Sequence, residues 1–302
     1  MGLYKKLVDK FCDFLTVHDG ERIASQSPPE NVTAVCDVNY ANDDELYNKL
    51  DVYYPAGAEN ELLPTIIDVH GGCWFYGTKD INKYYCMEIA AKGFKVVSIS
   101  YRLLFKGGRF PNNLTDLFHA YNWVERHADE YKFDLERIFL TGDSAGAHLC
   151  AMSNAVIADE TLAEKLNLKT GLQFKAVAYT CGVFDIDYYR KRLNISPVRF
   201  LLKEFFGKKY RKNEFLPLAT IANANLEKFP PIFLATAKGD FMRGQVLRFD
   251  KLLTKRGIEH ELNDLVGTSN KLEHVFPIIQ PHWEESEFVT NNMLEFFRTY
   301  AQ

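Results

Sequence analysis

The residues IFLTGDSAGAHLCAMSNAVI, at positions 138–157, decide the fold of this 302-residue chain. The first four are apolar or β-branched and predict a buried strand, whereas residues 145–157 have the pattern of a helix. The turn between them reads Gly142-Asp143-Ser144-Ala145-Gly146. Such a turn forces its central residue into strained dihedral angles. Small residues are needed at positions 142 and 146, because larger side chains would clash with the neighbouring strand and helix.

This strand–turn–helix setting is typical of a nucleophile elbow, which carries a reactive serine at the end of a strand. The five-residue pattern G-x-S-x-G alone arises by chance, and its position between a strand and a helix makes it specific. The helix N-terminus also directs free N–H groups toward developing negative charge. We therefore predict that Ser144 is a nucleophile. An incidental serine in a glycine-rich loop is the alternative.

The pattern around this turn alternates strands with helices. Two-sided apolar runs, which suit strands buried in a parallel sheet, lie at 64–70, 94–100, 137–141, 174–180, 231–237 and, more weakly, 261–266. Helical patterns lie at 81–92, 113–130, 145–157, 244–255 and 284–300. Residues 33–40 and 47–54 read as a preceding hairpin. The sequence predicts an α/β protein with the α/β-hydrolase fold and about eight strands in a mostly parallel, doubly wound sheet.

The chain is expected to form one domain, residues 1–302. Charged and apolar residues at helical spacing predict an N-terminal helix at 1–16, because charges interrupt the apolar run that a secretory signal needs. Residues 182–229 are too long for a simple connection between strands and contain aromatic helical stretches. An insertion of this length predicts a cap over a functional site.

A serine hydroxyl needs a base to remove its proton, and in this fold the chain order is serine, acid, histidine. His274 lies after the last predicted strand and before the final helix, so a loop can bring it over Ser144. His260 precedes that strand and His282 lies beside a proline. The remaining candidates fall within helical patterns, where structural roles are more common: His119, His127 and His148.

The acid is expected on the loop that leaves the strand at 231–237. Asp240 is the only carboxylate on that loop, although it could also serve as a helix N-cap. Asp185 and Asp187, which follow the preceding strand, are the alternatives. Asp264 lies within a predicted strand and is less suitable.

Glycines at the end of the first parallel strand suggest an oxyanion hole. The stretch reads His70-Gly71-Gly72-Cys73-Trp74. Acyl transfer forms a tetrahedral oxyanion that needs N–H donors already in position, and glycines let the backbone come close enough to supply them. Gly71, Gly72 and Ala145 are the predicted donors, and His70 is expected to orient the loop.

These motifs together resemble the hormone-sensitive-lipase-like esterase family and the related bacterial esterases that act on acylated sugars and cinnamoyl esters. The resemblance runs from about residue 47 to the C-terminus. It implies a serine carboxylesterase without cofactor, in which Ser144, Asp240 and His274 form the triad. Cys73 replaces the family's usual third glycine, which puts an inference about substrates in doubt. The HGG-x-W pattern also resembles kynurenine-formamidase-like enzymes, so amide hydrolysis is the alternative.

The remaining expectations concern the substrate and partners. Candidate pocket residues are Cys73, Trp74, Phe75, Tyr76 and Phe184, with Tyr188, Tyr189 and Phe200 as further insertion aromatics. Core packing is the other interpretation of these aromatics. A small-molecule ester is the expected partner, and a homo-oligomer is left open. A non-catalytic binding protein on this fold is a third hypothesis, disfavoured because nucleophile and base are both present.

Charge and composition argue against other classes. The formal net charge is −4 and no basic stripe predicts nucleic-acid binding. The cluster Lys208, Lys209, Arg211 and Lys212 is interpreted as a solvated surface stretch. No apolar run is long enough for a membrane span. The six cysteines have no metal-type spacing, so we expect reduced thiols, no metal and a cytoplasmic protein.

Overall fold

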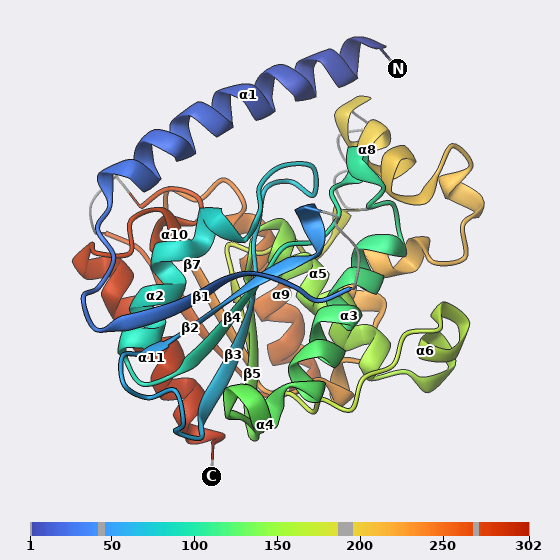
Figure 1. Cartoon of the computed structure of the whole chain (residues 1–302). Coiled ribbons are helices and arrows are strands. Elements are labelled where there is room, and N and C mark those ends of the chain that lie inside the picture. Colours follow the sequence, from blue (N-terminus) through green and yellow to red (C-terminus); the bar gives the residue numbers. More distant parts are fainter. Residues whose placement is uncertain (1, 42–45, 187–195, 268–271, 302) are drawn as a thin grey trace.

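The computed structural model describes residues 2–41, 46–186, 196–267 and 272–301. An eight-stranded sheet in the order β1-β2-β4-β3-β5-β6-β7-β8 runs through the molecule (Figure 1). The strands are β1 (Val32–Asn39), β2 (Lys49–Pro55), β3 (Leu63–Val69), β4 (Lys95–Ile99), β5 (Phe133–Asp143), β6 (Val177–Thr180), β7 (Ile232–Ala237) and β8 (His260–Leu265). The first two contacts, β1 with β2 and β2 with β4, are antiparallel, and the others are parallel. The predicted eight-stranded, mostly parallel sheet is confirmed.

The register of the central strands positions the site. β3 pairs in parallel with β5, and Val69 at the end of β3 lies opposite Gly142. The residues that follow these two partners are His70-Gly71 on one strand and Asp143-Ser144 on the other. The glycine loop and the serine turn therefore emerge side by side at the carboxyl edge of the sheet, where ligands of open α/β sheets bind.

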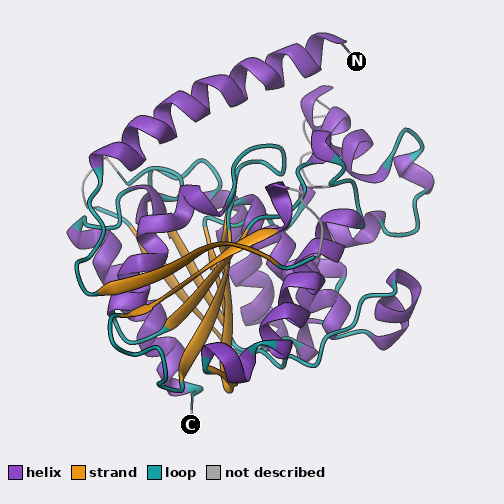
Figure 2. Ribbon diagram, in the orientation of Figure 1, coloured by secondary structure: helices purple, strands orange, loops and turns teal. Residues whose placement is uncertain are grey.

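Helices cover both faces of the sheet (Figure 2). One apolar core contains side chains of α3 (Asn112–Arg126), α5 (Ala145–Ile157) and α9 (Arg243–Arg256). The other contains side chains of α2 (Lys83–Ala91), α10 (Phe276–Ile279) and α11 (Glu284–Thr299). All residues of β4, β6 and β7 are buried, as expected of strands covered on both sides.

Several elements differ from the sequence-based expectation. The N-terminal helix α1 (Gly2–Ser25) continues past residue 16, since Pro28 is the first residue that cannot be accommodated in a helix interior. The helix predicted at 113–130 is divided at His127 into α3 and α4 (Ala128–Tyr131). A further helix, α6 (Glu160–Leu166), was not predicted.

The described residues of the insertion at 182–229 include α8 (Ser196–Phe206) and four short 3-10 helices, Tyr210–Lys212, Leu216–Ala219, Ile221–Asn223 and Leu226–Lys228. Figure 1 shows α1 crossing the molecule above the body, with its N-terminal end beside α8. The rings of Tyr4 on α1 and Phe200 on α8 stack there, with centroids 5.3 Å apart. Among the described residues, no helix combines the length and the apolar character needed to span a bilayer.

Candidate active site

Ser144 lies on the predicted sharp turn between β5 and α5. Its φ of 50° and ψ of −113° are unusual for a residue with a side chain. The Ser144 N–H donates to the Thr180 carbonyl of β6 at 2.9 Å, which holds the turn against the neighbouring strand. A Cβ at Gly146 would lie 2.0 Å from the Val69 carbonyl oxygen, so glycine is required for α5 to approach β3. The sequence-based argument for a small residue at position 146 thus has a structural counterpart.

A continuous hydrogen-bond chain joins the three residues predicted to act together. His274 Nε2 lies 2.9 Å from Ser144 Oγ. His274 Nδ1 lies 2.6 Å from Asp240 Oδ1. Because a carboxylate only accepts hydrogen bonds, the ring proton is on Nδ1, and Nε2 is left to accept from the serine hydroxyl. The fold therefore brings Ser144, His274 and Asp240 together from three separate segments.

The Asp240 carboxylate is buried but well supplied with donors. Oδ1 also accepts from the Met242 N–H at 2.8 Å, and Oδ2 accepts from the Thr236 hydroxyl at 2.7 Å. Burial raises the pKa of Asp240, but the hydrogen bond and charge of His274, with these two donors, outweigh it and hold that pKa below its ordinary value. Asp240 is therefore a carboxylate that can orient and stabilise a protonated His274.

The alternative acids and bases lie elsewhere. Asp185 accepts from the Thr220 hydroxyl at 2.7 Å within the insertion, and Asp187 lies outside the described residues. His260 contacts Asp250 at 3.2 Å beside β8, and His282 pairs with Glu88. His119 lies on α3 and His148 on α5, and His127 lies between α3 and α4.

The glycine loop differs from the expectation at Gly71. Its N–H donates to Asp143 Oδ1 at 3.0 Å, so it is not free to meet an oxyanion, and the prediction for Gly71 is corrected. Within the described residues, the N–H groups of Gly72, Cys73 and Ala145 donate to no partner. These three are the available donors beside Ser144. The loop bends sharply, with φ of 100° at Gly72 and 54° at Cys73.

Two buried carboxyl groups lie behind this loop. The Asn82 side-chain amide donates to Asp68 at 3.0 Å and to Asp143 at 2.9 Å. Burial and the charge of Asp143 raise the pKa of Asp68 to about 7. Burial likewise raises the pKa of Asp143, although the hydrogen bond from Asn82 opposes the shift. The serine turn is thus fastened to β3 and to the glycine loop by a buried polar network.

Ser144 and His274 line a cavity of about 280 Å³. Of the predicted pocket residues, Cys73 and Tyr76 line it. Trp74 and Phe184 are corrected, because their buried rings pack in the core, Trp74 against His148 and Phe205 and Phe184 against Tyr179 and Phe249. Phe75 is not in the cavity lining, but its ring contacts that of Phe11, which is. Tyr188 and Tyr189 lie outside the described residues, and Phe200 is beside α1.

Helix α1 supplies cavity residues that the sequence did not reveal, namely Phe11, Leu15, His18, Asp19 and Arg22. It is held there by hydrogen bonds from Tyr76 to Asp19 at 2.8 Å and from Arg22 to the Ile81 carbonyl at 2.9 Å. Phe241, beside Asp240 in the sequence, also lines the cavity, and its ring lies 4.2 Å from that of His274. The sequence offered one sign that Phe241 lies near the site, because it directly follows the predicted acid Asp240.

One cluster of polar atoms has a composition compatible with a metal. The ligand atoms of Cys181, Asp240 and His274 lie within 4.8 Å of one another among the described residues. Both ring nitrogens of His274 already have partners. Burial raises the pKa of the Cys181 thiol well above its ordinary value, whereas a metal ligand must be a thiolate. The chemistry of this cluster fits a hydrogen-bonded serine site better than a metal site.

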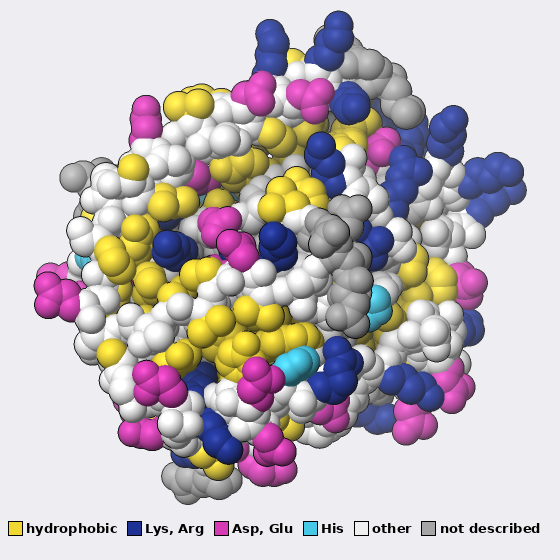
Figure 3. All heavy atoms as spheres, viewed as in Figure 1, with side chains coloured by type: hydrophobic (Ala, Val, Ile, Leu, Met, Phe, Trp, Pro, Cys, Tyr) yellow, Lys and Arg dark blue, Asp and Glu magenta, His cyan; other side chains and the backbone are white. Residues whose placement is uncertain are grey.

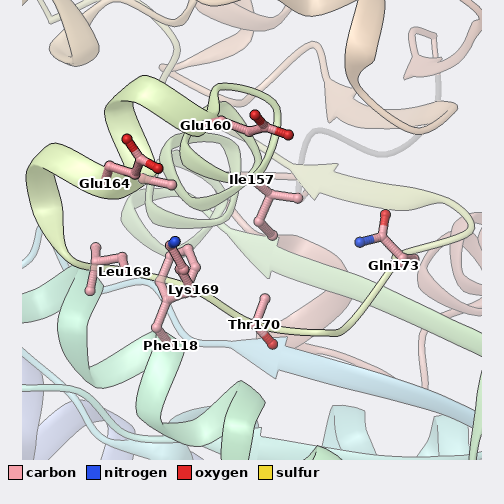
Figure 4. A pocket seen from close by; sticks show the side chains of 9 residues that line it. Phe118, Ile157, Glu160, Glu164, Leu168, Lys169, Thr170 and Gln173 are labelled. Carbon is pink, nitrogen blue, oxygen red and sulfur yellow. The ribbon is translucent and has the colours of Figure 1, made fainter.

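A second cavity, of about 360 Å³, is formed by α3, α5, α6 and the segment after α6 (Figure 4). Ile157, which ends α5, lines it together with Glu160, Glu164 and Lys169. Since Ser144 precedes the other end of this 13-residue helix, roughly 20 Å separate the two cavities. This cavity does not belong to the serine site.

The sequence resembles one family model and several characterised hydrolases. The BD-FAE family model matches residues 50–242. Carboxylesterase NlhH of Mycobacterium tuberculosis is 28% identical over 280 residues, a match that covers 86% of this chain and 84% of that protein. A kynurenine formamidase of Danio rerio is 24% identical over 255 residues, with 82% and 77% covered.

Solved structures agree with this family. Esterase B of Lactobacillus rhamnosis superposes with a TM-score of 0.92 and 25% identity, over 100% of this chain and 97% of that one. Brefeldin A esterase, a bacterial homologue of human hormone-sensitive lipase, shares the fold with a TM-score of 0.68 and 20% identity, over 95% and 84%. The α/β-hydrolase fold and the likeness to hormone-sensitive-lipase-like esterases are confirmed. The chain belongs to the BD-FAE family and is a carboxylic ester hydrolase.

Proposed function

We propose that this protein is a serine carboxylesterase that cleaves small acyl esters through a Ser144–His274–Asp240 triad and an acyl-enzyme. The observation that carries the proposal is the continuous hydrogen-bond chain from Ser144 Oγ through His274 to Asp240, at 2.9 and 2.6 Å, beside a cavity. A hydroxyl becomes a useful nucleophile when an oriented base accepts its proton.

In this mechanism His274 Nε2 takes the proton of Ser144 as Oγ attacks the ester carbonyl carbon. The negative charge that forms on the carbonyl oxygen is met by the N–H groups of Gly72, Cys73 and Ala145. The tetrahedral intermediate then breaks its bond to the alcohol oxygen, which receives the proton from His274. Asp240 keeps the imidazole oriented and stabilises its charged form throughout.

Water completes the cycle. His274 removes a proton from a water molecule, whose oxygen attacks the acyl carbon. The second tetrahedral intermediate breaks its bond to Ser144 Oγ, which recovers a proton from His274, and the carboxylic acid leaves. None of these steps needs a group beyond the protein, the ester and water.

The cavity supports a short acyl ester. Its volume of about 280 Å³ is at the small end of ligand pockets, and side chains of α1, Phe11 and Leu15 among them, form part of its wall. We infer that α1 and the insertion at 182–229 act as the cap of a single hydrolase domain. Acylated sugars and aryl esters are the substrate classes that we propose to test first, because the family resemblance includes enzymes for both.

The test is hydrolysis of a nitrophenyl ester series from acetate to octanoate, with a sugar acetate and a feruloyl ester. We expect the highest kcat/KM at short acyl lengths and its loss in Ser144→Ala. Labelling of the wild type, but not of Ser144→Ala, by a fluorophosphonate is the matched binding control. Unchanged turnover in Ser144→Ala would refute the proposed nucleophile.

Aryl formamide hydrolysis is the second candidate, favoured by the likeness to a kynurenine formamidase over 82% of this chain. The same triad would attack a formyl carbon and expel an amine instead of an alcohol. Comparing kcat/KM for formylkynurenine with that for phenyl acetate separates the two activities. A preference for the formamide would replace the ester as the proposed substrate while leaving the triad in place.

A further inference from the structure

Helix α1 carries several apolar side chains that the rest of the protein leaves exposed. Leu7, Phe11, Phe14 and Val17 have exposed fractions of 55%, 44%, 62% and 63%. Their spacing of four, three and three residues places them along one side of the helix, as an apolar stripe. None of the described α1 side chains is fully buried, so this helix lies on the surface.

The apolar stripe borders the mouth of the candidate active site. Phe11 belongs to the stripe and also lines the cavity that contains Ser144. Phe241, which is 68% exposed, lines the same cavity from the loop that carries Asp240. Exposed aromatic side chains thus contribute to the cavity from two separate segments. Contiguous exposed apolar surface around a site is a mark of an interaction surface.

A cationic segment lies beside the N-terminal end of the stripe. Residues 199–212 contain six basic side chains, Arg199, Lys203, Lys208, Lys209, Arg211 and Lys212. Their one acidic residue, Glu204, is paired with Arg109 at 2.8 Å. Among the described residues, no carboxylate forms an ion pair with any of the six. Lys and Arg side chains gather over α8 in Figure 3.

The stripe and the cationic segment share one face. Tyr4, one turn before Leu7, stacks on Phe200 of α8, and both line a depression together with Arg199 and Lys203. Figure 1 shows α1 and α8 on the same side of the molecule, beyond the carboxyl edge of the sheet. Because the whole chain is at net −4, this local positive charge would orient the protein on approach to an anionic surface.

We propose that this face docks on a lipid surface that carries negative charge, with the mouth of the cavity turned toward the lipid. The apolar stripe enters the interface, and the cationic segment binds the headgroups, as in surface-bound amphipathic helices. A second copy of the chain is the other occupant, and the test below distinguishes it. The proposal concerns binding and does not depend on the proposed ester.

The test is co-sedimentation of the full chain with vesicles of phosphatidylcholine alone or mixed with phosphatidylglycerol. We expect binding to the anionic vesicles that weakens as salt is raised, because exposed charges are screened. The same weak binding to both vesicle types would overturn the proposal. Light scattering of the free protein is run alongside, and a dimer that loses its interface in the variants below would assign this face to a second copy and overturn it.

Two matched pairs of variants locate the surface. Leu7→Ser with Phe14→Ser is expected to weaken vesicle binding more than tenfold, because both side chains lose burial in the interface. The control is Leu62→Ser with Phe288→Ser, which removes comparably exposed apolar side chains elsewhere. Equal effects of the two pairs would contradict docking through α1.

The charge pair is Lys208→Gln with Lys209→Gln, which should weaken binding to anionic vesicles on the order of tenfold or more. Lys251→Gln with Lys255→Gln on α9 is the control and should leave binding unchanged. Hydrolysis of a soluble nitrophenyl ester and thermal unfolding are measured for all four variants to show that they are folded. If the charge variant alone lost binding while the Leu7 and Phe14 variant retained it, the protein would adsorb to the anionic surface through charge alone, without the apolar stripe, and the docking proposal would fail.

Discussion

Asp143 Oδ1 accepts the N–H of Gly71 at 3.0 Å, and this bond joins the serine turn to the glycine loop. The two residues are 72 positions apart, yet β3 and β5 deliver them to adjacent places at the sheet edge. The bond takes the Gly71 N–H away from a substrate oxyanion. It also holds the loop that carries the free N–H groups of Gly72 and Cys73, and we infer from this contact that Asp143 positions them.

We expect Asp143→Ala to lower kcat/KM for a short nitrophenyl ester on the order of tenfold to a hundredfold, because the loop donors lose their alignment. The loss should be mainly in kcat, since the oxyanion forms only in the transition state. Asp143→Asn keeps an oxygen acceptor for Gly71 and should recover part of the rate. Equal losses in both variants, matched by equal losses of thermal stability, would indicate a purely structural role.

Asp240→Asn should lower kcat on the order of 10³- to 10⁴-fold while changing KM little, because an amide no longer fixes the His274 tautomer or stabilises its charge. Steady-state kinetics on nitrophenyl acetate measure this effect. Asp185→Asn is the matched control, since Asp185 was the alternative acid and contacts Thr220 instead. A comparable loss in both variants would argue against Asp240 as the specific partner of His274.

Gly146→Ala should destabilise the fold by more than about 2 kcal/mol, because its Cβ would overlap the Val69 carbonyl oxygen at 2.0 Å, and backbone atoms cannot move away cheaply. Thermal and denaturant unfolding report the change. Gly20→Ala on α1, where a Cβ would meet nothing within 4 Å, is the control and should lose no stability. A tolerated alanine at position 146 would contradict the close approach of α5 and β3.

Asp68→Asn should raise stability at pH 8 relative to the wild type, by on the order of 1–3 kcal/mol. The pKa of Asp68 is raised to about 7 in the folded protein, so the folded state binds more protons than the unfolded state between about pH 4 and pH 7. The wild type therefore loses stability as pH rises through that window, and the amide removes this loss. The measurement is the free energy of unfolding of the wild type and Asp68→Asn at pH 5 and pH 8, with the exposed Asp129→Asn as control. An equal difference between wild type and Asp68→Asn at both pH values would refute the prediction.

Leu15→Phe should narrow the cavity from the α1 side and reduce kcat/KM for butyrate and hexanoate esters more than for acetate. Leu15 lines the cavity. Val17→Phe on the same helix adds a ring at a position that is 63% exposed and should leave the acyl-length profile unchanged. An identical profile for wild type and Leu15→Phe would show that α1 does not limit the acyl group.

Much of the fold follows from local patterns in the sequence. Buried parallel strands read as continuous apolar runs, and the G-x-S-x-G turn marks the change from β5 to α5. The order of Ser144, Asp240 and His274 along the chain, each after a strand, predicted them among eight histidines and many carboxylates. The structure places these three side chains in one hydrogen-bond chain. These features are local, because secondary structure and turn chemistry depend on neighbouring residues.

The tertiary structure decided what depends on residues far apart in the chain. In the folded chain the Gly71 N–H donates to Asp143, and the rings of Phe184 and Trp74 pack in the core. Side chains of α1 line the cavity. The tertiary structure also placed the apolar stripe of α1 beside the cationic segment at 199–212, part of which the sequence alone presented as a solvated surface stretch. The sequence by itself determined the class of fold and predicted the reacting groups that we propose. Only the tertiary structure decided which N–H groups remain free and which side chains line the cavity. Both depend on how closely distant segments of the chain pack, and local sequence patterns do not report that distance.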